Sequence, residues 1–246
     1  MVNQAFWLVK KELKTNWTAL LLTVLVVIFL GLFATIFLEQ AARALFGQEV
    51  MYYNNPVLDI LFVALLPSLS TIFMSGPYLS FQTIKDDPYT KRMAFIRTLP
   101  IPVKIVALSR TCLMLLILLL MSIAFFGAIV YKLPSDFYQF VSAKELIIFI
   151  FAWFGYSLAL GGMNPFIEYG TSGKVLHLVP LFWIGLMMGL FVGFHSIVGY
   201  SIVEWSLLLI SQYGWIVAVV SIIFGGIGSA FWHKLLTRRL AKRDYM

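Results

Sequence analysis

Serine and histidine are the residues of this chain whose side chains could act in covalent chemistry. The sequence GTSG at residues 170–173 places Ser172 between two glycines. A serine nucleophile needs a histidine within hydrogen-bond reach to take its proton. Ser172 falls in a short loop between two apolar runs, whereas His233 ends the last apolar run, beside Lys234. We therefore interpret the GTSG sequence as ordinary turn chemistry.

Motifs for cofactor and metal chemistry are missing from the sequence. It holds no GxxxxGK[ST] phosphate loop, no HExxH pair and no cysteines or histidines at metal-ligand spacing. Its single cysteine, Cys112, lies inside an apolar run, which is typical of a buried small hydrophobic residue. We expect no enzymatic activity and no cofactor bound by this chain.

The composition indicates an integral membrane protein. Hydrophobic residues make up 61% and charged residues 12% of the 246 positions, against about 45–50% and 25% in soluble domains. The apolar runs are long enough to cross the ~30 Å hydrocarbon core and are continuous, which favours helices over barrel strands. We predict an all-α fold with one six-span transmembrane domain over residues 1–246. The spans are residues 17–38, 57–82, 105–131, 146–163, 175–200 and 213–232.

The distribution of lysine and arginine predicts the orientation. With the N-terminus inside, fifteen of the eighteen basic residues fall in inner segments, and only Arg43, Lys132 and Lys144 fall outside. Cytoplasmic segments carry this excess in multi-pass proteins. We predict a cell-membrane protein with both termini in the cytoplasm. The net charge of +7 is then a topology signal, so the basic tail at 233–246 is expected to meet membrane lipids rather than nucleic acid.

The first sixteen residues predict an amphipathic helix lying in the membrane interface. At 100° per residue, its apolar arc comprises Ala5, Phe6, Val9 and Leu13, and its basic arc comprises Lys10, Lys11 and Lys14. This arrangement is typical of an interfacial elbow helix that leads into the first span. A simple juxtamembrane anchor would show the same pattern.

The cytoplasmic loop at residues 84–104 predicts a second short helix. Asp87 is a good N-cap, Pro88 suits the first helical position, and Pro100 and Pro102 prevent continuation. The expected helix covers residues 88–98. Its apolar arc comprises Tyr89, Met93, Phe95, Ile96 and Leu99, interrupted by Arg92. A loop whose basic residues only kept it on the cytoplasmic side would need neither the cap nor the aromatic pair Tyr89 and Phe95.

The sequence TLPIPVKIVALSR at residues 98–110, with Asp87 thirteen positions before Pro100, resembles the loop entering the third span of ABC-2 type transporter permeases. The resemblance implies an elbow helix, six spans, and a cytoplasmic coupling helix that contacts an ABC ATP-binding subunit. ATP and Mg would be bound by that partner. The coupling residues that it implies are Asp87, Tyr89, Lys91, Arg92, Phe95 and Arg97.

The resemblance also implies ATP-driven export by a dimer with a second permease copy or a homologue. A peptide, an antimicrobial or a lipid-like compound is the expected substrate. Three glycines in the fifth run, Gly185, Gly189 and Gly193, are spaced for helix packing either at that dimer interface or within one subunit. The following segment, with Glu204, is expected to form short helices in the outer leaflet.

Two other functions stay open from the sequence alone. One is a membrane sensor or assembly protein without transport activity. The other, less favoured, is an intramembrane serine protease, because GTSG matches the GxSG sequence of rhomboid-type proteases.

Overall fold

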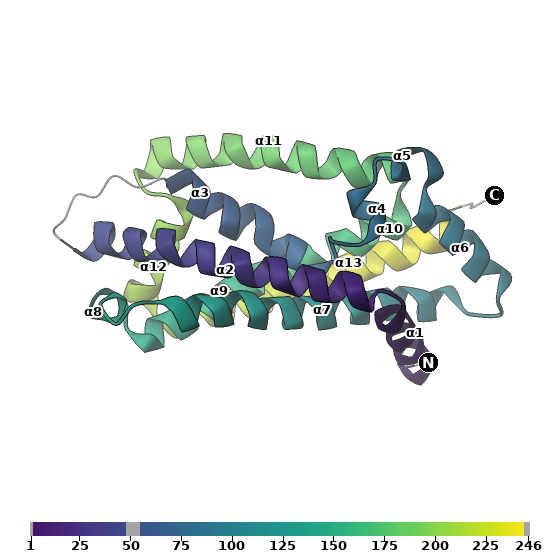
Figure 1. Ribbon diagram of the computed structural model, residues 1–246, viewed down its shortest axis with the longest axis horizontal. Coiled ribbons are helices and arrows are strands. Elements are labelled where there is room, and N and C mark those ends of the chain that lie inside the picture. The colour runs from purple at the N-terminus through teal and green to yellow at the C-terminus, as the bar shows by residue number, and fades with distance from the viewer. Residues whose placement is uncertain (1, 48–54, 244–246) are drawn as a thin grey trace.

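The computed structural model describes residues 2–47 and 55–243. Every regular element in these residues is helical, which confirms the predicted all-α class. The long helices lie side by side along one axis (Figure 1). Residue 1 of the predicted elbow helix and residues 244–246 of the predicted tail lie outside the described residues.

Five helical segments among the described residues are long and apolar enough to cross a membrane, as expected of a multi-pass membrane protein. They are α2 (Trp17–Phe46), α7 (Val103–Lys132), α9 (Ala143–Gly161) with its continuation α10 (Met163–Gly170), α11 (Gly173–Val198) and α13 (Trp215–Lys242). Five of the six predicted spans correspond to them. The last helix is longer than predicted, because α13 continues through most of the expected tail.

The remaining predicted span, residues 57–82, is not a continuous helix. It is divided into α3 (Asn55–Asp59), π-helical η1 (Ile60–Leu65) and 3₁₀-helical η2 (Leu66–Ser70), and α4 (Gly76–Leu79) and α5 (Thr83–Asp86) follow after a bend. The prediction of six continuous helices is therefore not confirmed. Figure 1 shows that this segment still runs from the α12 end of the bundle to the α5 end.

Side chains of neighbouring helices satisfy the backbone where this segment breaks. Pro67 has no N–H and lies in η2, so the regular hydrogen-bond pattern cannot continue through it. The Pro67 carbonyl accepts from the Asn164 side chain at 2.9 Å, and the Ser70 hydroxyl donates to the Gly161 carbonyl at 3.1 Å. The Asn164 bond satisfies a backbone carbonyl at the break, as a membrane-embedded backbone requires, and the Ser70 bond joins the broken segment to the end of α9.

The main core surrounds the broken segment. Phe62 of η1 is fully buried, and its ring makes edge contacts with Phe125, Phe149 and Trp153 at centroid distances of 5.7, 5.3 and 5.2 Å. Aromatic pairs at such distances and angles add to the free energy of burial. The segment is thus fixed at the centre of the bundle.

Glycines bring α9 and α13 into close contact. A Cβ atom on Gly155 would lie 2.5 Å from the backbone of Ser221, and one on Gly228 would lie 2.7 Å from the Ala159 carbonyl. Only glycine fits where helix backbones approach this closely. The predicted stripe behaves differently, because a Cβ added at Gly185, Gly189 or Gly193 would meet nothing within 4 Å. These three glycines therefore make no close helix contact with the described residues of this chain, and a role between subunits stays a prediction.

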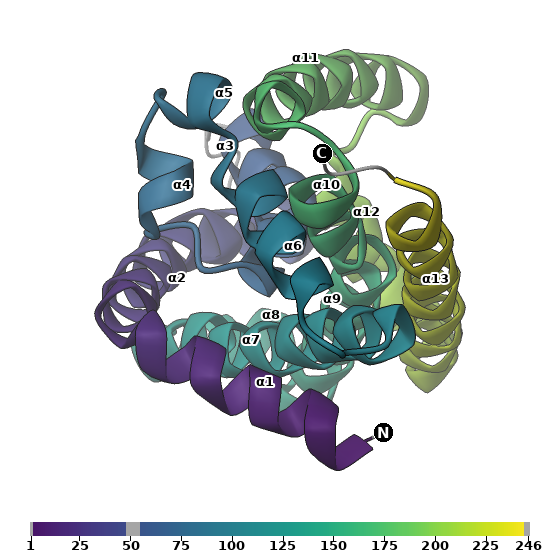
Figure 2. The same cartoon turned by 90° about the vertical axis from the view of Figure 1, so that its right-hand side faces the viewer.

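Short helices cover both ends of the bundle. Figure 2 shows α1 (Val2–Thr15) crossing α7 and α6 (Pro88–Thr98) lying over the same end. At the other end lie α8 (Phe137–Phe140) and α12 (Ile202–Tyr213), the latter confirming the short helix expected before the last span. The Asp59 carboxylate accepts from the N–H groups of Ile202 and Val203 at 3.1 and 3.0 Å, which joins α12 to the broken segment.

Candidate functional site

The short helix α6 has the predicted bounds and cap. The Asp87 carboxylate accepts from the backbone N–H of Thr90 at 3.1 Å and from its hydroxyl at 2.7 Å. Asp87 has a φ of 40°, in the left-handed region that short polar residues tolerate better than most. The helix begins at Pro88 and ends at Thr98, two residues before Pro100. Asp87, predicted as a coupling residue, is therefore the residue that starts the helix.

The inner face of α6 packs on the bundle. Met93 and Ile96 are buried in a cluster with Val106, Leu236 and Leu240, which belong to α7 and α13. The Tyr89 ring lies 5.2 Å from that of Tyr169 and 6.5 Å from that of Tyr78. Tyr89, one of the predicted coupling residues, packs on these rings within this chain, and its coupling role stays a prediction.

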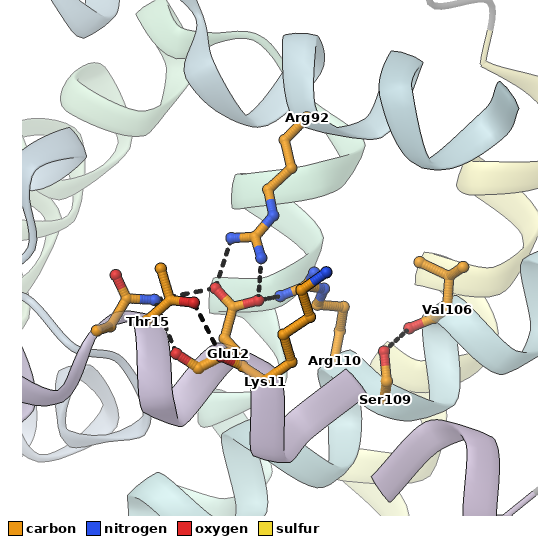
Figure 3. A network of polar contacts seen from close by, with 8 residues as sticks. Lys11, Glu12, Thr15, Arg92, Val106, Ser109 and Arg110 are labelled. Atoms are coloured by element: carbon orange, nitrogen blue, oxygen red, sulfur yellow. Dashed lines mark hydrogen bonds and ion pairs between the residues drawn. The ribbon is translucent and has the colours of Figure 1, made fainter. Parts of the chain in front are cut away.

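One carboxylate, that of Glu12, joins the three helices α1, α6 and α7 (Figure 3). Both terminal nitrogens of Arg92 in α6 donate to the two oxygens of Glu12 in α1, and Nη1 of Arg110 in α7 donates to Glu12 Oε2 at 2.7 Å. Glu12 is 6% and Arg110 5% exposed. The Arg110 guanidinium also lies 4.3 Å from the centre of the Tyr169 ring. Arg92, predicted as a coupling residue, thus binds within the chain.

The electrostatics of this cluster favour the ionised carboxylate. Burial alone would raise the pKa of Glu12, but the Arg110 and Arg92 guanidiniums outweigh it and hold the pKa below its ordinary value of 4.5. Burial, with the nearby Glu168 carboxyl, raises the pKa of Tyr89 well above its ordinary value. Glu12 is therefore charged and Tyr89 protonated at neutral pH.

The basic residues at the end of the chain also hold this region together. Arg97 of α6 donates to the Leu240 carbonyl. Arg243 donates to the Thr90 hydroxyl and to the Thr171 carbonyl, each at 2.6 Å, and Arg239 donates to the Gly170 carbonyl at 3.0 Å. The last two bonds satisfy carbonyls at the end of α10. These parts of the predicted tail bind the protein itself, and the expected contact of the tail with membrane lipids stays a prediction.

The outer face of α6 is free of such contacts with the bundle. It consists of Lys91 and Phe95, which are four residues apart and therefore on one side of the helix, and of Leu99, which directly follows the helix. Phe95 is 65% and Leu99 40% exposed, and Lys91 pairs only with the exposed Asp86 at 3.3 Å. Phe95 was expected on the same apolar arc as Met93, but it points away from the bundle. We call Lys91, Phe95 and Leu99 the outer face of α6.

A polar cavity of about 80 Å³ lies between this cluster and the broken segment. Its lining includes Glu12, Arg92, Arg110, Tyr78 and Glu168. The Tyr78 hydroxyl donates to Glu168 at 2.5 Å. Glu12, Arg110 and Glu168 were not predicted as a group. The sequence feature that could have identified them is an ionisable residue within or beside an apolar run. Such residues are rare unless they form ion pairs or have a function.

The structure does not assemble a serine nucleophile. Ser172 is exposed at the start of α11, and His233 Nδ1 lies 2.8 Å from the hydroxyl of Thr111. In the part of the chain that the structure describes, no three His, Cys, Asp or Glu residues are placed to hold a metal ion. No protein-family model, curated protein or solved structure matches this chain.

Proposed function

We propose that this chain is the membrane-spanning permease subunit of an ABC-2 type transporter. It would export its substrate with ATP that a separate ATPase subunit hydrolyses. The observation that carries the proposal is α6, a capped helix of eleven residues at the end of the bundle. Its inner face packs on the spans, and its outer face carries the exposed apolar side chains of Phe95 and Leu99 beside Lys91. A helix that receives a push from a partner needs both properties.

The contacts of α6 with other helices would transmit a displacement of α6 to the spans. Arg92 links α6 to Glu12 of α1, and Glu12 links α1 to Arg110 of α7. Arg97 and Arg243 tie α6 to the end of α13. Because packed interiors resist compression, a displacement of α6 moves α1, α7 and α13 with it. Tilting of these helices would switch access between the two sides of the membrane.

The proposed assembly contains two permease subunits and two ATP-binding subunits. The second permease is another copy or a homologue, and ATP and Mg bind only to the ATPase chains. Both termini would lie in the cytoplasm of a cell-membrane protein, since fifteen of the eighteen basic residues belong to the segments at that side. The substrate would be a peptide, an antimicrobial or a lipid-like compound.

A substitution on the outer face of α6 tests this proposal. Phe95→Asp places a charge at the proposed contact without touching the bundle, so it should uncouple ATP hydrolysis from export in proteoliposomes while the chain stays inserted. Tyr131→Asp is the control, because Tyr131 is an aromatic residue even more exposed than Phe95 and lies at the end of α7 that is far from α6. Unchanged export by the Phe95→Asp variant would contradict a coupling role for α6.

A further inference from the structure

An apolar cavity of about 260 Å³ lies between the broken segment, α10 and α11. Ala64 and Pro67 of the broken segment, Ile167 of α10, and Val179 and Trp183 of α11 are among the residues that line it. An apolar cavity of about 150 Å³ is enough to bind benzene in other proteins. This cavity is therefore large enough for a compound of about two fused rings.

The cavity lies where two helices depart from regular geometry. Both η1 and η2 contribute to its lining, and so does Pro180, which interrupts the hydrogen bonds of α11. In membrane transporters, interrupted helices commonly line the ligand site. An irregular backbone at membrane depth is tolerated where it lines a cavity. The cavity is therefore placed as a ligand site would be.

No charged residue lines this cavity among the residues that the structure describes. Hydrogen bonds from Asn164 to Pro67 and from Tyr78 to Glu168 join α10 to the broken segment, and they lie between this cavity and the polar one. Burying an ion without a partner of opposite charge is strongly unfavourable. A ligand of this cavity is therefore uncharged.

The Asn164 carboxamide supplies a hydrogen-bond acceptor. Its Nδ2 donates to the Pro67 carbonyl at 2.9 Å and to the Ser70 hydroxyl at 2.7 Å. Because a carbonyl can only accept, these bonds fix which end of the carboxamide faces η2. Oδ1 is the other end, and it accepts from no group among the described residues. Since Asn164 lines the apolar cavity and not the polar one, a donor on a ligand in the apolar cavity is the partner that suits Oδ1.

The cavity reaches the outer surface of the bundle between η1 and α11. Ile60 and Ile184 both line it, and they are 40% and 53% exposed. Both belong to predicted membrane-spanning segments, so this surface faces the hydrocarbon of the bilayer. Uncharged apolar compounds concentrate there because water excludes them. A lipid acyl chain would reach the same opening, but it carries no donor for Asn164.

We propose that this cavity binds an uncharged compound of about two fused rings that carries one hydroxyl or N–H donor. The donor binds Asn164 Oδ1, and the rings lie between the broken segment and Trp183 of α11, whose indole offers an aromatic surface. The inference deepens the proposed function by naming the class of compound. It rests on that function for the claim that the bound compound is exported.

Scintillation proximity binding of tritiated 2-naphthol to the purified full chain in detergent tests the inference. We expect saturable binding that Val179→Phe weakens at least about tenfold, because the added ring occupies the cavity. Val192→Phe is the matched control, since Val192 lies on the same helix, is 66% exposed and does not line the cavity. It should leave the affinity unchanged. Equal affinities of the two variants would overturn the proposal.

The natural protein tests the role of Asn164 Oδ1 without any substitution. 2-Methoxynaphthalene has the same rings and no donor, so at equal concentration in the micelles it should bind at least about fivefold more weakly than 2-naphthol. 2-Naphthoate, which is charged, should not compete. Equal binding of the hydroxyl and methoxy compounds would show an apolar groove of the kind that an acyl chain fills, and it would overturn the proposal. Competition by 2-naphthoate would also overturn it.

Two results separate the inference from the proposed function. If an ATPase subunit co-purifies with the chain and 2-naphthol shows no saturable binding, the inference fails and the transporter proposal stands. If 2-naphthol binds as expected and no ATPase co-purifies, the binding site stands and the transporter proposal fails.

Discussion

Glu12 is the residue on which three helices converge, since its two carboxylate oxygens accept from Arg92 of α6 and Arg110 of α7. Its burial means that the ion pairs are shielded from solvent. Burying the pairs costs desolvation, yet removing one partner is worse because it leaves a buried charge alone. The cluster therefore constrains the relative positions of α1, α6 and α7.

Replacing Glu12 tests this constraint. Glu12→Gln should lower the free energy of unfolding by about 3–5 kcal/mol, because Arg110 stays buried without its carboxylate. Glu39→Gln is the matched control, since Glu39 pairs with Arg43 on a half-exposed surface and should cost at most about 1 kcal/mol. Denaturant titration of the purified protein in detergent measures both. Equal losses in the two variants would contradict the role of the Glu12 cluster.

The same carboxylate predicts a dependence of stability on pH. The pKa of Glu12 is lower in the folded protein than its ordinary value of 4.5. Its contribution is therefore complete above pH 4.5 and is lost as the pH falls through the lower folded value. Melting temperatures between pH 6 and 3 should show this loss in the natural protein and not in Glu12→Gln. Parallel curves for the two proteins would exclude Glu12 as the titrating group.

Single residues differ in how far the sequence predicts their roles. Asp87 was identified as an N-cap because capping depends on neighbours within three positions. The pairing of Glu12 with Arg110 joins residues 98 positions apart, which no local pattern records. Phe95 was predicted on the buried side of α6. In the structure the buried side is the one that carries Arg92 and Tyr89, because these residues contact α1 and α10.

At the scale of elements, α6 depends on its cap. Asp87→Ala should cost about 0.5–2 kcal/mol, because it removes the acceptor for the Thr90 N–H and puts alanine at a positive φ. Asp87→Asn should cost only a fraction of that, since asparagine keeps an acceptor and tolerates the left-handed conformation. Thermal unfolding in detergent distinguishes them. If Asn is as harmful as Ala, the charge of Asp87 matters more than its capping geometry.

The α9–α13 contact gives a second prediction at this scale. Gly155→Ala should cost about 1–3 kcal/mol, because its Cβ would overlap the Ser221 backbone. Gly189→Ala should change the stability of the single chain by less than about 0.5 kcal/mol, because its Cβ would meet nothing. Unfolding in denaturant compares the pair. A larger loss for Gly189→Ala would mean that α11 packs against a partner in the membrane.

The elements also show which helices the sequence predicts. Continuous apolar runs and flanking prolines located five long helices and α6, because these signals are local. The break in residues 57–82 was not predicted, although Pro67 and the Gly76–Pro77 pair within this run are local signals that interrupt a helix. The bonds of Pro67 to Asn164 and of Ser70 to Gly161 stabilise it, and both partners lie more than ninety positions away.

Over the whole molecule, the end that carries α1, α5 and α6 differs from the opposite end. It holds the Glu12 cluster, the arginine contacts of α13, the polar cavity and the exposed outer face of α6. The predicted orientation places this end in the cytoplasm, where an ATPase subunit would bind. The all-helical membrane fold was predictable from composition, whereas this concentration of contacts was not.

The measurement that tests the account most directly is affinity purification of the tagged chain from its native membrane in mild detergent, with mass spectrometry of the bound proteins. The account predicts a stoichiometric ABC ATPase that is lost from the Phe95→Asp variant and retained by Tyr131→Asp. A preparation without any ATPase, under conditions that keep a known ABC transporter intact, would contradict the proposed function.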